Sequence, residues 1–273
     1  MPLPKLLIES PDGARAEVYL HGAHVTSWVE AGHDEHLYLS PRSEFRSGSP
    51  IRGGIPVIFP QFSTFGPLPK HGFARTSEWN LVGPATFRLT DSTATRAVWP
   101  HPFVAEVTVA VGGRTLDVRF SVWNSGSEPF EFTTALHTYP RVADVRRVLV
   151  LGLEGARYRD STAGGAERVQ PEHPLSIGGD VDRIYPDVSG PVEIRESHHS
   201  TRCSMTGFRD VVIWNPGPTA NLPDMEPGAY QRMLCVEAAA IAIPVRLGPG
   251  EEWGGTQRLE ARDTQLADGL PPE

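Results

Sequence analysis

This 273-residue chain contains only two cysteines, Cys203 and Cys235, and both lie in apolar, strand-like stretches. We therefore expect buried, reduced thiols in preference to a disulfide. No apolar run approaches the length of a membrane span, and the first residues, MPLPKLLIESPDG, lack the apolar core and cleavage site of a signal peptide. These absences predict a cytoplasmic protein that has no membrane partner.

Positive charge is also scarce, because 25 Lys and Arg stand against 33 Asp and Glu, for a formal net charge of −8. A nucleic-acid-binding protein would carry a basic stripe, so we expect no nucleic acid partner. The chain has no P-loop, no Rossmann glycine pattern and no GxSxG motif. The pair His198-His199 has no cysteine or acidic partner at metal-ligand spacing. We predict neither a metal nor a cofactor.

Glycine and proline, by contrast, are abundant: 27 glycines and 26 prolines divide the chain into short segments. This pattern is typical of an all-β fold. In the clearest predicted hairpin, Phe103–Trp123, apolar residues alternate along FVAEVTVAV and TLDVRFSVW on either side of a Gly112-Gly113 turn. No segment of ten or more residues has a convincing amphipathic helical pattern. We predict one all-β domain, residues 1–273, built as a large sandwich of antiparallel sheets.

Short strands are predicted at Ala16–Leu20, His24–Val29, Ala94–Trp99, Arg147–Leu153, Val192–Glu196, Val211–Trp214, Met233–Val236 and Trp253–Glu260. Surface loops are predicted at Asp160–Pro174 and Gly217–Gly228.

The segment Pro50–Arg75, PIRGGIPVIFPQFSTFGPLPKHGFAR, sustains neither a helical nor a strand period. It places cations and one imidazole among glycines, prolines and aromatics, which favours a rigid loop that presents them to an anionic ligand. The guanidinium forks of Arg52 and Arg75 match a phosphate or sugar hydroxyls, although they could instead tether the loop to carboxylates. Lys70 is the weakest candidate, since an exposed lysine in such a loop is usually solvated.

Three further residues could perform acid–base chemistry. His71 precedes Gly72, which allows backbone or ligand to approach closely, and His137 ends an apolar run. Either histidine could donate a proton, and either could be a core histidine bonded to backbone. Glu237 lies in MLCVEAAAI, where every neighbour within four positions is apolar. A buried carboxylate there would have a raised pKa suited to a base; a structural ion pair or an outward-facing position is the alternative.

Two further positions could contact a sugar. Asp182 follows a Gly-Gly pair and could accept hydrogen bonds from sugar hydroxyls, or cap a turn. Trp214 and Asn215 offer an aromatic platform and an amide at a strand end, but a core tryptophan fits the pattern equally well.

The chain resembles the hexose-6-phosphate mutarotases (glucose-6-phosphate 1-epimerases) of the aldose 1-epimerase superfamily. The resemblance is carried, in order, by IRGGIPVIFPQF, FGPLPKHGFAR, WPHPF, ALHTYPRV, VDRIYP, VVIWNP and CVEAAAI. It implies a galactose-mutarotase-like β-supersandwich and interconversion of the α and β anomers of a hexose 6-phosphate. We expect a monomer whose partner is a small-molecule sugar phosphate. A mutarotase of unphosphorylated aldoses and a non-catalytic carbohydrate-binding protein remain the alternatives.

The resemblance also implies roles for individual residues. The histidine of ALHTYP, His137, would be the general acid that protonates the ring oxygen. Glu237 of CVEAAAI would be the base that removes the proton of the anomeric hydroxyl, and His71 of HGFAR would assist by hydrogen bonding. The substrate-binding set would comprise Arg52 and Arg75 on the phosphate, Asp182 on sugar hydroxyls, and Gln61 and Trp214.

Overall fold

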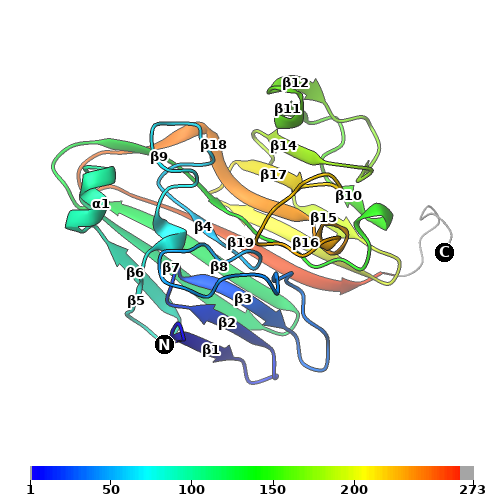
Figure 1. The fold of residues 1–273 in the computed structure, drawn as a ribbon, viewed down its shortest axis with the longest axis horizontal. Coiled ribbons are helices and arrows are strands. Elements are labelled where there is room, and N and C mark those ends of the chain that lie inside the picture. Colours follow the sequence, from blue (N-terminus) through cyan, green and yellow to red (C-terminus); the bar gives the residue numbers. More distant parts are fainter. Residues whose placement is uncertain (1, 265–273) are drawn as a thin grey trace.

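Three antiparallel β-sheets build the protein, whose computed structural model describes residues 2–264 (Figure 1). The all-β prediction is confirmed. The predicted single domain, residues 1–273, stays a prediction; Met1 and residues 265–273 lie outside the described residues.

The smallest sheet has the order β1-β2-β3, from β1 (Lys5–Glu9), β2 (Arg15–Tyr19) and β3 (His24–Val29). The nine-stranded sheet contains, in order, β13 (Leu175–Ser176), β10 (Leu149–Leu151), β15 (Val192–Arg195), β16 (His199–Thr206), β19 (Glu252–Asp263), β8 (Thr115–Asn124), β7 (Phe103–Gly112), β6 (Thr86–Thr90) and β5 (Asn80–Leu81). The seven-stranded sheet contains, in order, β12 (Ala166–Val169), β11 (Arg157–Asp160), β14 (Val181–Tyr185), β17 (Asp210–Asn215), β18 (Cys235–Leu247), β9 (Phe130–Leu136) and β4 (Val57–Ile58). The helical elements are α1 (Thr93–Val98) and the 3-10 turns η1 (Ala74–Thr76), η2 (Val145–Arg147), η3 (Ser161–Ala163) and η4 (Ala229–Arg232).

The core lies between the nine- and seven-stranded sheets. On β18, Val236 and Ala238 point into this core, where they join residues such as Phe120 of the nine-stranded sheet. Because side chains alternate along a strand, Cys235 and Glu237 point to the opposite face of the seven-stranded sheet. The sheet therefore has one face that stabilises the sandwich and one that is available for a site.

The predicted hairpin is confirmed, with its turn one residue later than expected. Strands β7 and β8 pair from Phe103↔Asn124 to Gly112↔Thr115. Gly112 is therefore the last paired residue of β7, and Gly113, with φ of 56°, begins the turn. A left-handed backbone is least costly for glycine, and this explains why the second glycine of the pair occupies the turn.

The strand predicted at Ala94–Trp99 is wrong, because residues 93–98 form the helix α1. Its N-terminus is a capping box: the Ser92 hydroxyl accepts a bond from the backbone N–H of Thr95, and the Thr95 hydroxyl accepts one from the backbone N–H of Ser92. Such reciprocal bonds satisfy two N–H groups that a helix start would otherwise leave unpaired. This local contact decided the structure of a segment too short for a helical period to be seen.

The remaining strand predictions are confirmed: His24–Val29 matches β3 at both ends, and the others have shifted boundaries. Strand β18, for example, starts within the predicted Met233–Val236 segment but continues to Leu247. The loop predicted at Asp160–Pro174 is partly wrong, since residues 166–169 form β12, which pairs with β11 in a hairpin at the sheet edge. Residues 217–228 contain no helix or strand, as expected.

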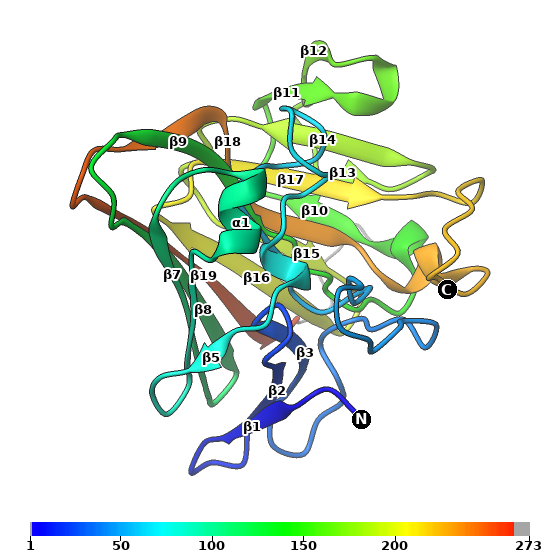
Figure 2. The same ribbon diagram turned by 60° about the vertical axis from the view of Figure 1, so that its left-hand side comes forward.

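A long loop, residues 59–73, follows β4 and crosses the outer face of the seven-stranded sheet toward β11 (Figure 2, cyan). The crossing brings Phe65 of the loop against Arg159 of β11, whose guanidinium carbon lies 4.7 Å from the ring centroid. At its end the loop returns to its own start, where a Cβ on Gly72 would lie 2.2 Å from the carbonyl oxygen of Phe59. Glycine at 72 thus allows close approach of backbone.

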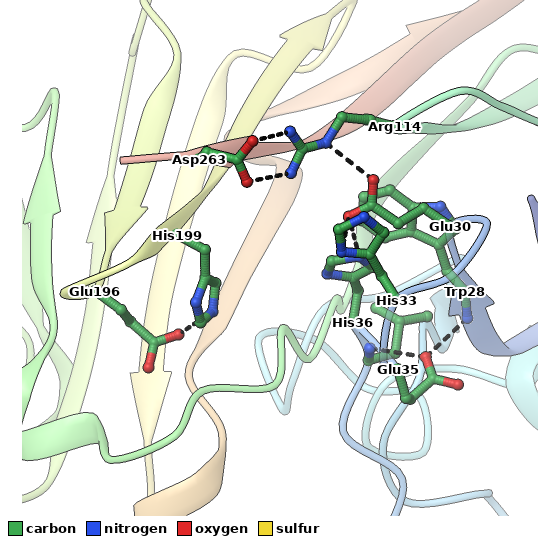
Figure 3. A network of polar contacts seen from close by, with 10 residues as sticks. Trp28, Glu30, His33, Glu35, His36, Arg114, Glu196, His199 and Asp263 are labelled. Carbon is green, nitrogen blue, oxygen red and sulfur yellow. Dashed lines mark hydrogen bonds and ion pairs between the residues drawn. The ribbon is translucent and has the colours of Figure 1, made fainter. Parts of the chain in front are cut away.

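A polar network fastens the smallest sheet to the nine-stranded one (Figure 3). The buried carboxylate of Glu30, just after β3, accepts a hydrogen bond from Arg114 Nε at 2.9 Å and lies 3.1 Å from His36 Nε2. Arg114, in the β7–β8 turn, also forms two bonds to Asp263 of β19. Nearby, His199 lies 2.6 Å from Glu196, so it does have an acidic neighbour.

Candidate active site

Two neighbouring strands bring the predicted acid and base together. Strands β9 and β18 pair with Leu136 opposite Ala238, so the next residues in register are His137 and Glu237. His137 Nε2 lies 3.3 Å from Glu237 Oε1, and both side chains are buried. The structure therefore places His137 and Glu237 in direct contact, 100 positions apart in the chain, on the outer face of the seven-stranded sheet.

The same face carries a second row of polar and aromatic side chains. Asp182 of β14 is opposite Trp214 of β17, and Trp214 is opposite Cys235 of β18. The ring of Trp214 meets the His137 ring edge to face, with centroids 5.8 Å apart. Trp214 is half-buried at the border of two apolar clusters, which is closer to the platform interpretation than to a fully buried core tryptophan.

Tyr139 is a site residue that the sequence analysis missed. Its ring stacks on His137 with centroids 4.9 Å apart, and its hydroxyl accepts a hydrogen bond from Arg52 Nη1 at 2.9 Å. Tyr139 follows His137 by two positions, so the period of an extended chain places both side chains on one face. That spacing within ALHTYP was the available signal.

The loop that crosses the sheet adds His71, whose ring centroid is 5.7 Å from that of His137. The Ser63 backbone N–H donates to His71 Nδ1 at 3.2 Å, and a backbone N–H can only donate. In neutral His71 the proton must therefore reside on Nε2, which makes this atom a hydrogen-bond donor. Burial, followed by the nearby charge of Arg75, lowers the pKa of His71 to about 3, so the ring is neutral near pH 7.

Arg52 and Arg75, for which phosphate binding stays a prediction, lie near enough to His137 that the charge of each lowers its pKa. Arg52 donates to Asp224 Oδ2 at 3.0 Å as well as to Tyr139. Burial by itself would lower the pKa of Arg52. The contacts of Arg52 with Tyr139 and Asp224 have the larger effect, so its pKa is raised. Burial lowers the pKa of Arg75, and repulsion by Arg52 adds to this effect. Two partly buried guanidinium groups that repel each other favour binding of an anion nearby.

Asp224 is the second site residue that was missed. It lies in the 217–228 loop, whose sequence GPTANLPDMEPG has no motif or period to indicate a contact with Arg52. Only the folding of that loop over the sheet brings the two residues together.

Two proposed binding groups are occupied by structural bonds. Gln61 donates to the carbonyl oxygens of Ser63 and Leu68 and accepts from the Leu68 N–H, so it closes the loop on itself. Asn215 is fully buried and bonds to the backbone of Met233 and Gly217. Both residues shape the loops around the site.

Burial drives the two central groups toward their neutral forms. Burial, followed by the charge of Asp182, raises the pKa of Glu237 well above its ordinary value. Burial, followed by the charge of His71, lowers the pKa of His137 well below its ordinary value. At a pH above the pKa of His137 and below the pKa of Glu237, the two side chains together hold one proton, which either residue can carry. Among residues 2–264, Glu237 Oε2 and His137 Nδ1 are buried and have no hydrogen-bond partner, so each residue keeps an unsatisfied polar atom.

No group of three or more His, Cys, Asp or Glu within residues 2–264 could hold a metal ion. In the same part of the chain, no helix is long and apolar enough to cross a membrane.

Comparison with known proteins defines the class of this protein, a sugar epimerase with a galactose-mutarotase-like fold. A crystal structure of a mutarotase from Salmonella typhimurium (titled "putative mutarotase") superimposes with a TM-score of 0.88 at 29% identity, over 96% of this chain and 92% of that one. Galactose 1-epimerase from Lactobacillus acidophilus shares the fold, with a TM-score of 0.72 at 14% identity over 96% of this chain and 95% of that one.

Sequence relatives agree with the structural ones. The sequence model of the family described as aldose 1-epimerase matches residues 4–260. Two proteins named "Putative glucose-6-phosphate 1-epimerase" are each 34% identical to this chain. The one from Cenchrus ciliaris covers 98% of this chain and 87% of its own length, and the one from Escherichia coli covers 87% and 83%. The chain belongs to the aldose 1-epimerase family. It is therefore an isomerase whose substrate is a sugar.

Proposed function

We propose that this protein interconverts the α and β anomers of a hexose 6-phosphate, with glucose 6-phosphate as the expected substrate. The observation that carries the proposal is the buried contact between His137 and Glu237, near which the guanidinium groups of Arg52 and Arg75 lie. The names of the relatives from Cenchrus ciliaris and Escherichia coli support the same substrate.

The reaction needs one proton donor and one proton acceptor at the same carbon. Glu237 removes the proton of the O1 hydroxyl while His137 protonates the ring oxygen O5, and the C1–O5 bond breaks to give the open aldehyde. Rotation about C1–C2 then presents the other face of the carbonyl, and the two proton transfers run in reverse. Because O1 and O5 are both bonded to C1, an acid and a base that touch each other, as these do, can reach both oxygens.

The pair starts and ends each half-reaction with one proton in total. Ring opening moves this proton from His137 to the substrate while Glu237 gains another, so the pair passes from the charged form to the neutral form. Burial favours the neutral form, which is the one present when the aldehyde is bound. The direct contact also provides a route by which the proton returns from Glu237 to His137 between turnovers.

The surrounding residues hold the sugar in place. His71, with its proton on Nε2, donates a hydrogen bond to an oxygen at the reacting carbon without competing for the proton. Arg52 and Arg75 bind the phosphate, and Asp182 accepts hydrogen bonds from sugar hydroxyls while the sugar packs on Trp214. Gln61, which the resemblance assigns to binding, supports the loop that carries His71.

The test follows anomer interconversion of glucose 6-phosphate and of free glucose by NMR exchange, with the spontaneous rate subtracted. We expect acceleration of the phosphosugar well above that of glucose. Acceleration of glucose alone would assign the enzyme to unphosphorylated aldoses. Acceleration of neither sugar by folded protein would favour another sugar or a binding protein.

One observation favours the alternative of an unphosphorylated sugar. Arg52 forms an ion pair with Asp224, so a carboxylate already neutralises the guanidinium that would otherwise bind the phosphate.

Arg52→Ala should raise KM for glucose 6-phosphate by ~10–100-fold and change KM for any glucose turnover much less, because a guanidinium binds phosphate through two charge-assisted bonds. The matched control is Arg42→Ala, which removes another arginine that contacts the 217–228 loop through the carbonyl oxygen of Met225. Steady-state kinetics on both sugars measure the effect. Equal losses on the two sugars would remove Arg52 from phosphate binding.

The rate should stay constant through pH 6.5, the ordinary pKa of histidine. Between a lowered His137 pKa and a raised Glu237 pKa the pair holds one proton throughout, so the fraction with protonated His137 and ionised Glu237, the reactive form, does not change with pH. The rate should fall only when the pair gains a second proton in acid or loses its proton in alkali. A profile of kcat between about pH 5.5 and 8 tests this, and an inflection near 6.5 would contradict it.

We further infer a cytoplasmic monomer that binds no nucleic acid. The cytoplasm is supported by the two free, buried thiols of Cys203 and Cys235 and by a phosphorylated substrate, which is charged and retained in cells. The acidic balance of the chain argues against nucleic acid.

A further inference from the structure

The β11–β12 hairpin and the loop that crosses the sheet border an open cavity of about 1040 Å³. It is lined by Phe65 from the loop, by the hairpin arginines, and by Ile184 and Ile241 of the sheet. None of the residues assigned above to catalysis or substrate binding lines it. Ile184 nevertheless belongs to the apolar cluster that Trp214 borders, so the cavity and the active site lie on the same sheet face.

The cavity is positively charged, although the chain as a whole is acidic. Arg157, Arg159 and Arg168 line it against a single carboxylate, that of Glu167. Arg168 lies 3.5 Å from Asp160, but neither Arg157 nor Arg159 has a carboxylate within 4.0 Å among the described residues. Glu167 is opposite Arg159 in register, yet the two side chains form no ion pair. The cavity therefore offers two free guanidinium groups, which suit a phosphate chain.

The cavity also exposes apolar surface that a phosphate by itself would leave unused. The side chains of Phe65 and Val169 are 48% and 59% exposed, and both line the cavity. Phe65 stands with one ring face against the Arg159 guanidinium. Such an exposed aromatic beside cations suits a flat, ring-bearing group that stacks while its charged end is bound. The volume also lies at the upper end of the range for small-molecule sites.

We propose that this cavity binds a nucleoside diphosphate, with its phosphates on Arg157 and Arg159 and its base against Phe65. The proposal goes beyond the epimerase reaction and does not depend on it. Binding would also act on the loop that carries His71, because Phe65 belongs to the segment that Gln61 closes.

The test is isothermal titration of the whole protein with ADP, with adenosine and inorganic phosphate as separate ligands. We expect ADP to bind in the micromolar range and the two fragments to bind at least tenfold more weakly. Arg159→Ala and Phe65→Ala should each weaken ADP by about tenfold or more. The matched control is Arg258→Ala, an exposed arginine paired with Asp117 on the nine-stranded sheet, which should leave ADP binding unchanged.

Two further variants separate this site from the catalytic one. Glu237→Gln and Arg52→Ala should both bind ADP as the wild type does, whatever their activity. Loss of ADP binding in Arg52→Ala would place the nucleotide in the active site and overturn the proposal. Binding that survives Arg159→Ala, or is absent at millimolar ADP, would also overturn it. Inorganic phosphate that binds as tightly as ADP would overturn the nucleoside assignment.

Discussion

Glu237→Gln should lower kcat for anomer interconversion by at least ~10²-fold, the smaller end of the range for losing a general base. The glutamine keeps the size of the side chain but cannot take the proton of the O1 hydroxyl. Substrate KM should change little, because the carboxylate is used in the proton transfer more than in ground-state binding. NMR exchange of glucose 6-phosphate measures both quantities.

The same substitution should leave the fold intact and its stability equal or higher. Glu237 has a raised pKa in the folded protein, so its ionised form disfavours folding increasingly as pH rises above the unfolded value. An uncharged glutamine avoids this cost at pH 7. The matched control is Glu131→Gln, at an exposed position of β9, which should keep full activity. Wild-type kcat in Glu237→Gln would remove this residue from the mechanism.

His137→Asn should lower kcat by ~10²–10⁴-fold, because asparagine can form hydrogen bonds but cannot donate a proton to O5 at neutral pH. An effect confined to KM would contradict the role of general acid. The exposed His173 provides the control: His173→Asn should be fully active.

Combining the two substitutions distinguishes a shared proton from two independent groups. If His137 and Glu237 act as a one-proton pair, the double variant should lose about as much kcat as the more damaged single variant. Residues that function as a unit show this non-additivity. Losses that multiply would show that each residue acts without the other, despite their 3.3 Å contact.

Most of the strand pattern could be predicted because each strand buries one face. Alternating apolar residues in β7 and β8 indicated both strands, and His24–Val29 matched β3 at both ends. Helix α1 was missed because a capping box, rather than a hydrophobic period, stabilises it. Strand β12 was missed because all four of its residues are exposed, so no burial pattern marks it.

The candidate site divides in the same way. The apolar surroundings of Glu237 indicated burial, and Tyr139 could have been found from its spacing after His137. The partner of Arg52 could not be found, because Asp224 is 172 positions away in a loop without a pattern. Gln61 looked like a binding residue since its motif is part of the resemblance, but the structure shows that its amide bonds within its own loop.

The sequence by itself determined the all-β class, the family and the identity of the acid, the base and the arginines as candidates, because these depend on local periodicity and on motifs. Only the tertiary structure decided that His137 touches Glu237, that the proton of neutral His71 resides on Nε2, and that Asp224 pairs with Arg52. Each of these facts depends on strand register or on a loop crossing a sheet. Register and crossing are set by packing between residues far apart in the chain, and no local pattern records such packing.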